Sequence, residues 1–172
     1  MTKYLKKLSP FVLIILILIT ISCRENREQK KNSESVETVK VVNFDNKKEL
    51  AAYTQMNLDS THPNLLNPQI SRSEYDTVVQ SWKGLHHDLE QYLSQNDFNW
   101  GVKDSTITIV QKIYFNPEGK INTYFFRVIN NEVTEEKKEE LAHLIASFAQ
   151  NHSIGIKREE PFAQCGKTRY LN

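Results

Sequence analysis

The sequence has few of the features that specify a reaction or a membrane-spanning protein. It contains only two cysteines, Cys23 and Cys165, among 172 residues, so it cannot carry a disulfide framework. Its longest apolar block, Phe11 to Ile21, is shorter than the roughly 20 residues that a spanning helix needs. No phosphate-binding loop, dinucleotide fingerprint or Ser-His-Asp order is present. The sequence therefore indicates no particular reaction.

An excess of positive charge is also missing. The chain has 22 basic and 21 acidic residues, which gives a formal net charge of +1. If residues 1 to 22 are removed, three lysines leave with them and the net charge becomes about −2. Nucleic-acid binders depend on a strongly basic surface, so the composition argues against a nucleic-acid partner.

The first 22 residues are typical of a secretory signal, because three lysines precede the apolar block and no acidic residue occurs before Glu25. The residues that follow, Thr20-Ile21-Ser22-Cys23, resemble the lipobox of bacterial lipoproteins. That resemblance implies that the chain is cut before Cys23, that its thiol receives a diacylglycerol and that its new amino group is acylated. Two or three acyl chains anchor a protein stably. The alternative is an uncleaved signal anchor in which Cys23 has no role.

Lipidation at Cys23 would leave Cys165 as the only thiol and exclude an intramolecular disulfide. Arg24 follows the cysteine, whereas some bacteria retain lipoproteins in the inner membrane through an Asp at that position. We therefore expect a lipid-anchored protein of the cell envelope, at the outer membrane and facing the periplasm. Residues 23 to 38 lack a hydrophobic pattern and indicate a flexible tether.

Residues 39 to 100 predict a mainly helical segment. "VKVVNF" favours a short strand and "DNKKELAAYTQM" a short helix, whereas the two prolines of "THPNLLNPQ" favour a loop. Apolar residues then recur every three or four positions, which predicts a helix from Glu74 to Gln95 with Ser73 as its cap and Asp76 three residues on. Its apolar stripe comprises Tyr75, Val78, Val79, Trp82, Leu85, Leu89 and Tyr92 or Leu93.

Residues 101 to 172 predict the order strand, strand, helix, strand. "TITIVQKIYF" and "INTYFFRVI" are rich in β-branched and aromatic residues, and "NPEG" between them predicts a hairpin turn. Thr134 can cap a helix whose stripe is Leu141, Leu144, Ile145 and Phe148, and "FAQCGKTRYLN" predicts a last strand. The expected fold class is α+β: a small antiparallel sheet, made of the hairpin and the terminal strand, packed with two main helices.

The segment from Thr106 to Leu171 resembles the carboxy-terminal domain of TonB-type energy transducers. The resemblance is carried by "IYFNPEGKINTYFFRVI", followed by the predicted helix and terminal strand. It implies a small α+β sheet that receives partner peptides on its last strand. The family's Tyr-Pro ahead of the first strand, its Pro-rich linker and its uncleaved anchoring helix are missing here. The resemblance therefore implies a fold and a binding role, without energy transduction.

The terminal strand is consequently our candidate partner-binding site. A strand at the edge of a sheet exposes unpaired amide and carbonyl groups, with which an extended peptide can pair. Lys167 and Arg169 can equally be charges that prevent aggregation at such an edge. The candidate edge residues are Phe162, Gln164, Lys167, Thr168, Arg169 and Tyr170.

Other candidate chemistry is weaker. His86 and Glu90 stand one helical turn apart, where two ligands can share a metal, but a closed site needs more ligands than these and His87. Cys165 is either a nucleophile or a half-buried packing residue. The side chains of Trp82, Trp100, Tyr124, Phe125 and Phe126 can line a ligand groove or fill the core. We expect no catalytic residue, no cofactor and no metal.

Two functions remain open. The first is a non-enzymatic envelope lipoprotein that binds a protein or peptide, and the alternative is a lipoprotein that binds a small ligand or metal through the aromatic side chains and His86 with His87. An unpaired, apolar edge strand would favour the first function. A groove that holds both histidines together with convergent polar groups would favour the alternative.

Overall fold

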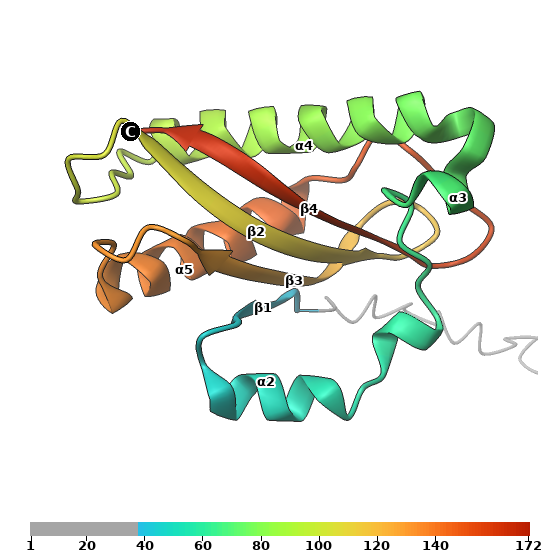
Figure 1. Cartoon of the computed structure of the whole chain (residues 1–172), viewed down its shortest axis with the longest axis horizontal. Helices are drawn as coiled ribbons and strands as arrows, with labels where there is room; N and C mark the ends of the chain where they lie inside the picture. Colours follow the sequence, from blue (N-terminus) through green and yellow to red (C-terminus); the bar gives the residue numbers. More distant parts are fainter. Residues whose placement is uncertain (1–37) are drawn as a thin grey trace, which may run out of the picture. The chain divides into compact units, whose positions relative to one another are not determined.

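The computed structural model describes residues 38 to 172, so Cys23 and the predicted signal and tether lie outside the described residues. Four strands form one sheet in the order β1-β3-β2-β4. Figure 1 shows this sheet between helix α4 on one side and helix α2 on the other. The strands are β1 (Lys40–Asn43), β2 (Thr106–Phe115), β3 (Ile121–Val128) and β4 (Phe162–Leu171). The helices are α2 (Lys47–Thr54), α3 (Pro68–Ser71), α4 (Tyr75–Gln95) and α5 (Glu135–Asn151), with short 3-10 turns η1 (Leu58–Ser60) and η2 (Arg72–Glu74).

The predicted α+β class is confirmed, but the sheet is mixed instead of wholly antiparallel. Strand β2 pairs antiparallel with both β3 and β4, as expected for a hairpin and a terminal strand. Strand β1 adds to the free side of β3 in parallel orientation. A parallel pair needs a long connection between its two strands. The chain provides one, because α2, α3, α4 and β2 lie between β1 and β3.

Helices α4 and α5 cover one face of the sheet, which we call the inner face, and bury the main core. Every second residue of β2 points to this side, including the fully buried Ile107 and Ile113. Helix α4 contributes most of its predicted stripe together with His86, a residue that the pattern did not include. In α5, Leu141, Ile145 and Phe148 are buried as predicted, whereas Leu144 is only half-buried and Ala149 completes the stripe.

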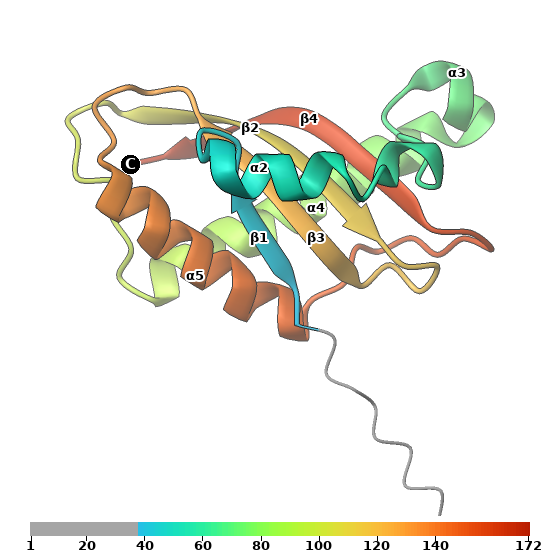
Figure 2. The same cartoon turned by 90° about the horizontal axis from the view of Figure 1, so that it is seen from below.

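The outer face carries a smaller cluster beneath α2. Its buried members are Val42, Tyr114, Phe125 and Ala163, packed against Phe44, Tyr53 and Leu58. Figure 2 shows α2 crossing the strands on this side. The part of the outer face formed by the middle of β4 is not in this cluster, because Lys167 and Arg169 are exposed there.

The local signals near the turns were mostly correct. Gly119 has φ +83° and its N–H donates to the carbonyl of Asn116 at 2.9 Å, which confirms the hairpin turn. The Thr134 side chain accepts from the Lys137 N–H at 3.3 Å, which confirms that cap. The Ser73 cap is wrong: η2 precedes the helix, so α4 begins at Tyr75 after Glu74, and no side-chain hydrogen bond caps it. Within residues 38 to 172, no helix combines the length and the apolar character needed to cross a membrane.

Candidate functional site

Strand β4 lies at one edge of the sheet, where the sequence analysis placed it, and its first half is covered. The Ala163 N–H donates to the Pro63 carbonyl at 3.0 Å, and the Ala163 carbonyl accepts from the Leu65 N–H at 2.8 Å. The Cys165 N–H donates to Oδ1 of Asn64 at 3.1 Å. Residues 63 to 65 therefore bond both main-chain groups of Ala163 and the N–H of Cys165 at this end of β4.

The middle of β4 is open. Because pairing groups alternate along an antiparallel strand, the main-chain groups of Lys167, Arg169 and Leu171 also face away from β2. The Leu171 N–H donates to Oε1 of Glu90 at 3.2 Å, which covers the far end. Among residues 38 to 172, no group is bonded to the outward main chain of Lys167 or Arg169. The open edge is thus a window about two residues long, closed at both ends.

A cavity of about 560 Å³ lies beside this window, between the flank of α4 and β4. We call it the edge groove. The two elements are in contact here, since a Cβ added at Gly166 would come within 3.0 Å of the Trp82 ring. Helix α4 lines the groove with Trp82, Lys83, His86, His87 and Glu90, and β4 lines it with Lys167, Thr168, Arg169 and Tyr170.

The rim of the edge groove is positively charged. Lys83, Lys167 and Arg169 are exposed, and none of them belongs to the six ion pairs found among the described residues. Among residues 38 to 172, Glu90 is the only carboxylate that lines the groove, and it already accepts the hydrogen bond from Leu171. An anionic group in the groove would therefore meet uncompensated positive charge.

His86 forms the inner wall of the edge groove. Its side chain is buried, and its Nδ1 atom lies 2.7 Å from the hydroxyl of Tyr170. The Trp82 ring packs edge-on against the imidazole at a centroid distance of 4.1 Å. Burial disfavours the charged imidazolium and lowers the pKa of His86 to about 3. His86 is therefore neutral near pH 7.

Four buried side-chain polar atoms have no hydrogen-bond partner among residues 38 to 172. Helix α4 and strands β2 and β4 each contribute to this set, which lies on the inner face of the sheet. Leaving such a group unpaired costs roughly 1–3 kcal/mol. His86 and Thr168 also line the edge groove, so two of the four unpaired groups belong to residues of its wall. The unpaired atoms are Nε2 of His86, Nε2 of Gln111, Oε1 of Gln164 and Oγ1 of Thr168.

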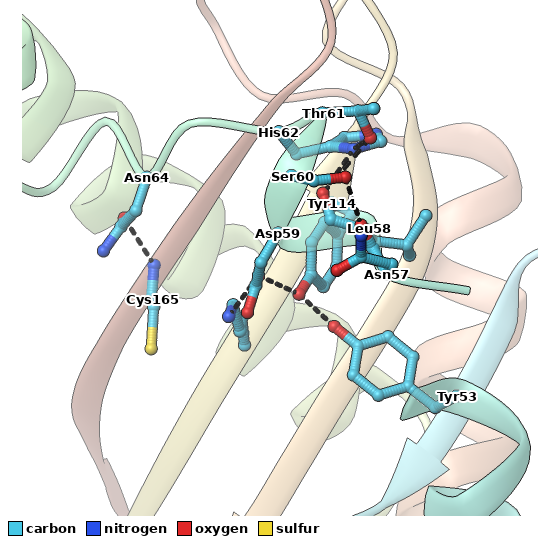
Figure 3. A network of polar contacts seen from close by, with 11 residues as sticks. Tyr53, Asn57, Leu58, Asp59, Ser60, Thr61, His62, Asn64, Tyr114 and Cys165 are labelled. Carbon is cyan, nitrogen blue, oxygen red and sulfur yellow. Dashed lines mark hydrogen bonds and ion pairs between the residues drawn. The ribbon is translucent and has the colours of Figure 1, made fainter. Parts of the chain in front are cut away.

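A second polar network lies on the outer face and fastens η1 to the sheet (Figure 3). The Tyr114 hydroxyl donates to Oδ1 of Asp59 at 2.6 Å and accepts from the hydroxyl of Tyr53. Asp59 also pairs with Nζ of Lys112 at 2.5 Å, and the bonds from Lys112 and Tyr114 lower the pKa of its carboxyl. Burial raises the pKa of Tyr53 to about 12 and that of Tyr114 further. Both phenols therefore stay protonated and act as hydrogen-bond donors.

Cys165 is half-buried at the border of this network. Burial is the main influence on its thiol and raises its pKa, opposite to the shift that activates a nucleophile. Its main-chain N–H donates to Asn64, so the main chain and not the sulfur makes this bond. These features fit the interpretation of Cys165 as a packing residue.

The predicted edge residues divide into two sets. Phe162, Gln164 and Tyr170 point to the inner face and are at most 2% exposed, so their side chains are not available to a partner. Thr168 shares that face, whereas Lys167 and Arg169 project on the opposite face and lie at the open window. The period-two alternation of a strand separates Lys167 and Arg169 from the other four residues, but the sequence alone did not show which set faces the core.

The predicted histidine pair stays together, and the predicted aromatic residues are mostly dispersed. His86 and His87 both line the edge groove. Two other histidines lie elsewhere: His62 contacts Tyr114, and His152 stacks on Phe148. Among residues 38 to 172, no three His, Cys, Asp or Glu side chains lie close enough to hold a metal ion. Of the predicted aromatic residues, Trp82 lines the groove, and the buried side chains of Trp100, Tyr124, Phe125 and Phe126 belong to the core clusters.

Comparisons with protein-family models, curated proteins and solved structures found no match to this chain. The site therefore rests on its own geometry. Sequence reasoning missed Lys83 and the contact of Glu90 with β4. Helical spacing was the available signal, because Trp82, His86 and Glu90 follow one another at intervals of four residues and so share a face.

Proposed function

We propose that this chain is a non-enzymatic, lipid-anchored module of the cell envelope that binds an extended segment of a partner protein along β4. The observation that carries the proposal is the open window at Lys167 and Arg169, whose outward main-chain groups have no partner among the described residues. An extended peptide pairs with such groups by strand addition. The resemblance of residues 106 to 171 to TonB-type domains, which receive peptides on their last strand, agrees with this mode.

The edge groove supports the same proposal. A two-residue window alone supplies few hydrogen bonds, but the flank of α4 gives an added strand a second wall through Trp82, Lys83 and His87. The covered ends at Ala163 and Leu171 limit where a strand can add. Such limits suit selective capture of one segment better than open-ended edge-to-edge association.

The lipid anchor belongs to the proposal through the lipobox-like residues that end at Cys23. An anchored module with a tether of about fifteen residues can reach partners at the membrane surface while its folded part stays in water. We propose a location at the outer membrane, facing the periplasm, because Arg24 stands where an Asp retains some lipoproteins in the inner membrane.

Proline scanning of β4 tests the binding mode. Proline at Lys167 or Arg169 removes an outward N–H and leaves the ladder to β2 intact, whereas proline at Thr168 would break a bond of that ladder. Lys167→Ala is the matched control, because it removes the charge and keeps the N–H. Peptides selected from a displayed random library on the full-length protein in detergent should bind Lys167→Pro at least tenfold more weakly than Lys167→Ala.

Two results would overturn the peptide-binding proposal. One is a selection that returns no peptide with affinity for the full-length protein. The other is unchanged binding to Lys167→Pro and Arg169→Pro, each shown by circular dichroism to keep the fold, since the open window would then play no part.

A small polar ligand in the edge groove is the second candidate. It is favoured because the groove holds both His86 and His87 together with polar groups, because the open window is charged and not apolar, and because atoms of His86 and Thr168 are unpaired among the described residues. A ligand that satisfied them would recover part of their desolvation cost. Thermal-shift screening with small polar compounds tests it, with His87→Ala and Thr168→Val as groove variants. Stoichiometric zinc that disappeared in the double variant His86→Ala, His87→Ala would instead favour the metal-binding form of this candidate.

A further inference from the structure

We propose that the edge groove selects an acidic partner segment, with Asp or Glu at every second position. This inference rests on the peptide-binding function proposed above and specifies the chemistry of the peptide. It follows from the position of Lys167 and Arg169, the two cations of β4, which take part in no ion pair among the described residues.

Lys167 and Arg169 share one face of the sheet. They alternate with Gly166, Thr168 and Tyr170, of which Gly166 contacts Trp82 and Tyr170 belongs to the inner core. Lys167 and Arg169 therefore project on the outer face, on the same side as Ala163. In a strand added beside β4, alternate side chains project on that same face. Directly opposite pairs lie about 4.5–5.5 Å apart between Cβ atoms, a distance at which opposite charges attract.

Three more cations lie on this face, and two of them are already compensated. Val110 of β2 pairs with Arg127 on one side and with Lys167 on the other, so these side chains form one row across the sheet. Arg127 pairs with Asp45 at 3.0 Å, and Lys112 pairs with Asp59 at 2.5 Å. The third, Lys40, is in no ion pair among the described residues, but it lies on β1 at the opposite edge of the sheet. The uncompensated charge beside the open window is therefore that of Lys167 and Arg169, where a partner strand would add.

The same charges disfavour a second copy of this chain as the occupant. If two β4 edges paired through their open windows, Lys167 and Arg169 of one chain would lie against the same residues of the other. Like charges directly opposite one another destabilise a strand pair. A heterologous acidic segment satisfies the charge and the hydrogen bonds together.

Designed peptides test the charge pattern on the full-length protein in detergent. The probes are fluorescent ten-residue peptides that alternate Glu with Thr or Lys with Thr, and a third of the first composition in which the five Glu precede the five Thr. The alternating Glu peptide should bind at least tenfold more tightly than the other two, and the difference should shrink as salt is added. The double variant Lys167→Glu, Arg169→Glu should prefer the Lys peptide.

Lys120→Glu with Lys157→Glu is the control, because it changes the net charge equally at two exposed positions that do not line the groove. It should keep the preference for the alternating Glu peptide. If the double Glu variant at β4 does not fold, Lys167→Gln with Arg169→Gln should still reduce the preference to about twofold.

The outcomes separate the two proposals. One outcome is that selected peptides depend on the N–H of Lys167 while the Glu and Lys peptides bind equally. It would leave the peptide-binding function intact and overturn the preference for acidic segments. Equal binding of the alternating and the block Glu peptides would overturn the alternation. Loss of the preference in the Lys120→Glu, Lys157→Glu control would show that the preference depends on the net charge of the protein and not on the cations of β4. No binding by any peptide overturns both proposals.

Discussion

The Nδ1 atom of His86 lies 2.7 Å from the hydroxyl oxygen of Tyr170, and this contact joins the middle of α4 to the end of β4. It holds helix and strand together at the inner wall of the edge groove. Because both side chains are buried, the geometry of the groove depends on a histidine that is kept neutral. The first prediction concerns how the free energy of unfolding changes at acidic pH.

Stability should fall as the pH drops below 6.5. The pKa of His86 is about 3 in the folded protein and about 6.5 when unfolded, so the unfolded chain binds a proton in this range that the folded chain does not. The unfolding free energy should therefore lose up to roughly 1.4 kcal/mol per pH unit. Urea unfolding of residues 38 to 172 between pH 7.5 and 4.5 measures this slope.

His86→Leu should flatten the slope while lowering stability at pH 7.5, because it also removes the bond to Tyr170. His87→Leu is the matched control at an exposed neighbour and should keep the slope. The depressed pKa of Asp59 acts below its unfolded value of 3.8, outside this pH range. Equal slopes for the original chain and His86→Leu would contradict the assignment.

Two glycines should respond to alanine in opposite directions. At Gly166 a Cβ would meet the Trp82 ring at 3.0 and 3.2 Å, so Gly166→Ala should destabilise the protein by roughly 1–3 kcal/mol. At Gly84, in the middle of α4, nothing lies within 4 Å, so Gly84→Ala should stabilise it by about 0.5–1 kcal/mol. Urea midpoints of the two variants decide the matter, and a shift of both in the same direction would be inconsistent with this packing.

The outer network predicts unequal costs for two similar substitutions. Tyr114→Phe removes the donor to Asp59 and the acceptor for Tyr53, so we expect a loss of about 1–2 kcal/mol. Tyr53→Phe leaves the bond between Tyr114 and Asp59 in place and should cost less. Hydrogen exchange should show faster opening of η1 only in Tyr114→Phe. A larger effect of Tyr53→Phe would mean that α2, and not the bond to Asp59, holds this segment.

Lipid attachment is the prediction for the part of the chain outside the described residues. Cells that express the full chain can be labelled with a clickable fatty acid, and the purified protein should carry the label. Cys23→Ser should abolish it, and Cys165→Ser should leave it unchanged. Equal labelling of the Cys23→Ser variant and the original chain would rule out the lipobox interpretation.

The predictable part of the fold was the part with strong local periodicity. Strand β2 matched its predicted span, Thr106 to Phe115, because β-branched and aromatic residues alternate there between two faces. Helix α4 matched to within one residue, since its apolar residues recur at helical spacing. The parallel pairing of β1 could not be predicted, because four residues carry no signal for the strand that they join.

The candidate site was predictable only in part, for a related reason. The sequence placed Lys167 and Arg169 on an edge strand. Their place in a groove beside α4 depends on how a helix and a strand about seventy residues apart pack together. His86 was considered only as a candidate ligand, and its burial was left open. Its place on the face of Trp82 and Leu89 was visible in the spacing, but the apolar pattern did not count histidine.

The position of β2 at the centre of the sheet has a consequence for biosynthesis. Its partner β3 follows after a five-residue turn, but its other partner, β4, emerges only after α5 and nearly fifty residues later. Until then β2 has an open flank, and the chain carries an exposed template for unwanted association. The sheet is therefore complete only when β4 arrives, and a chaperone would protect β2 most effectively before that strand docks.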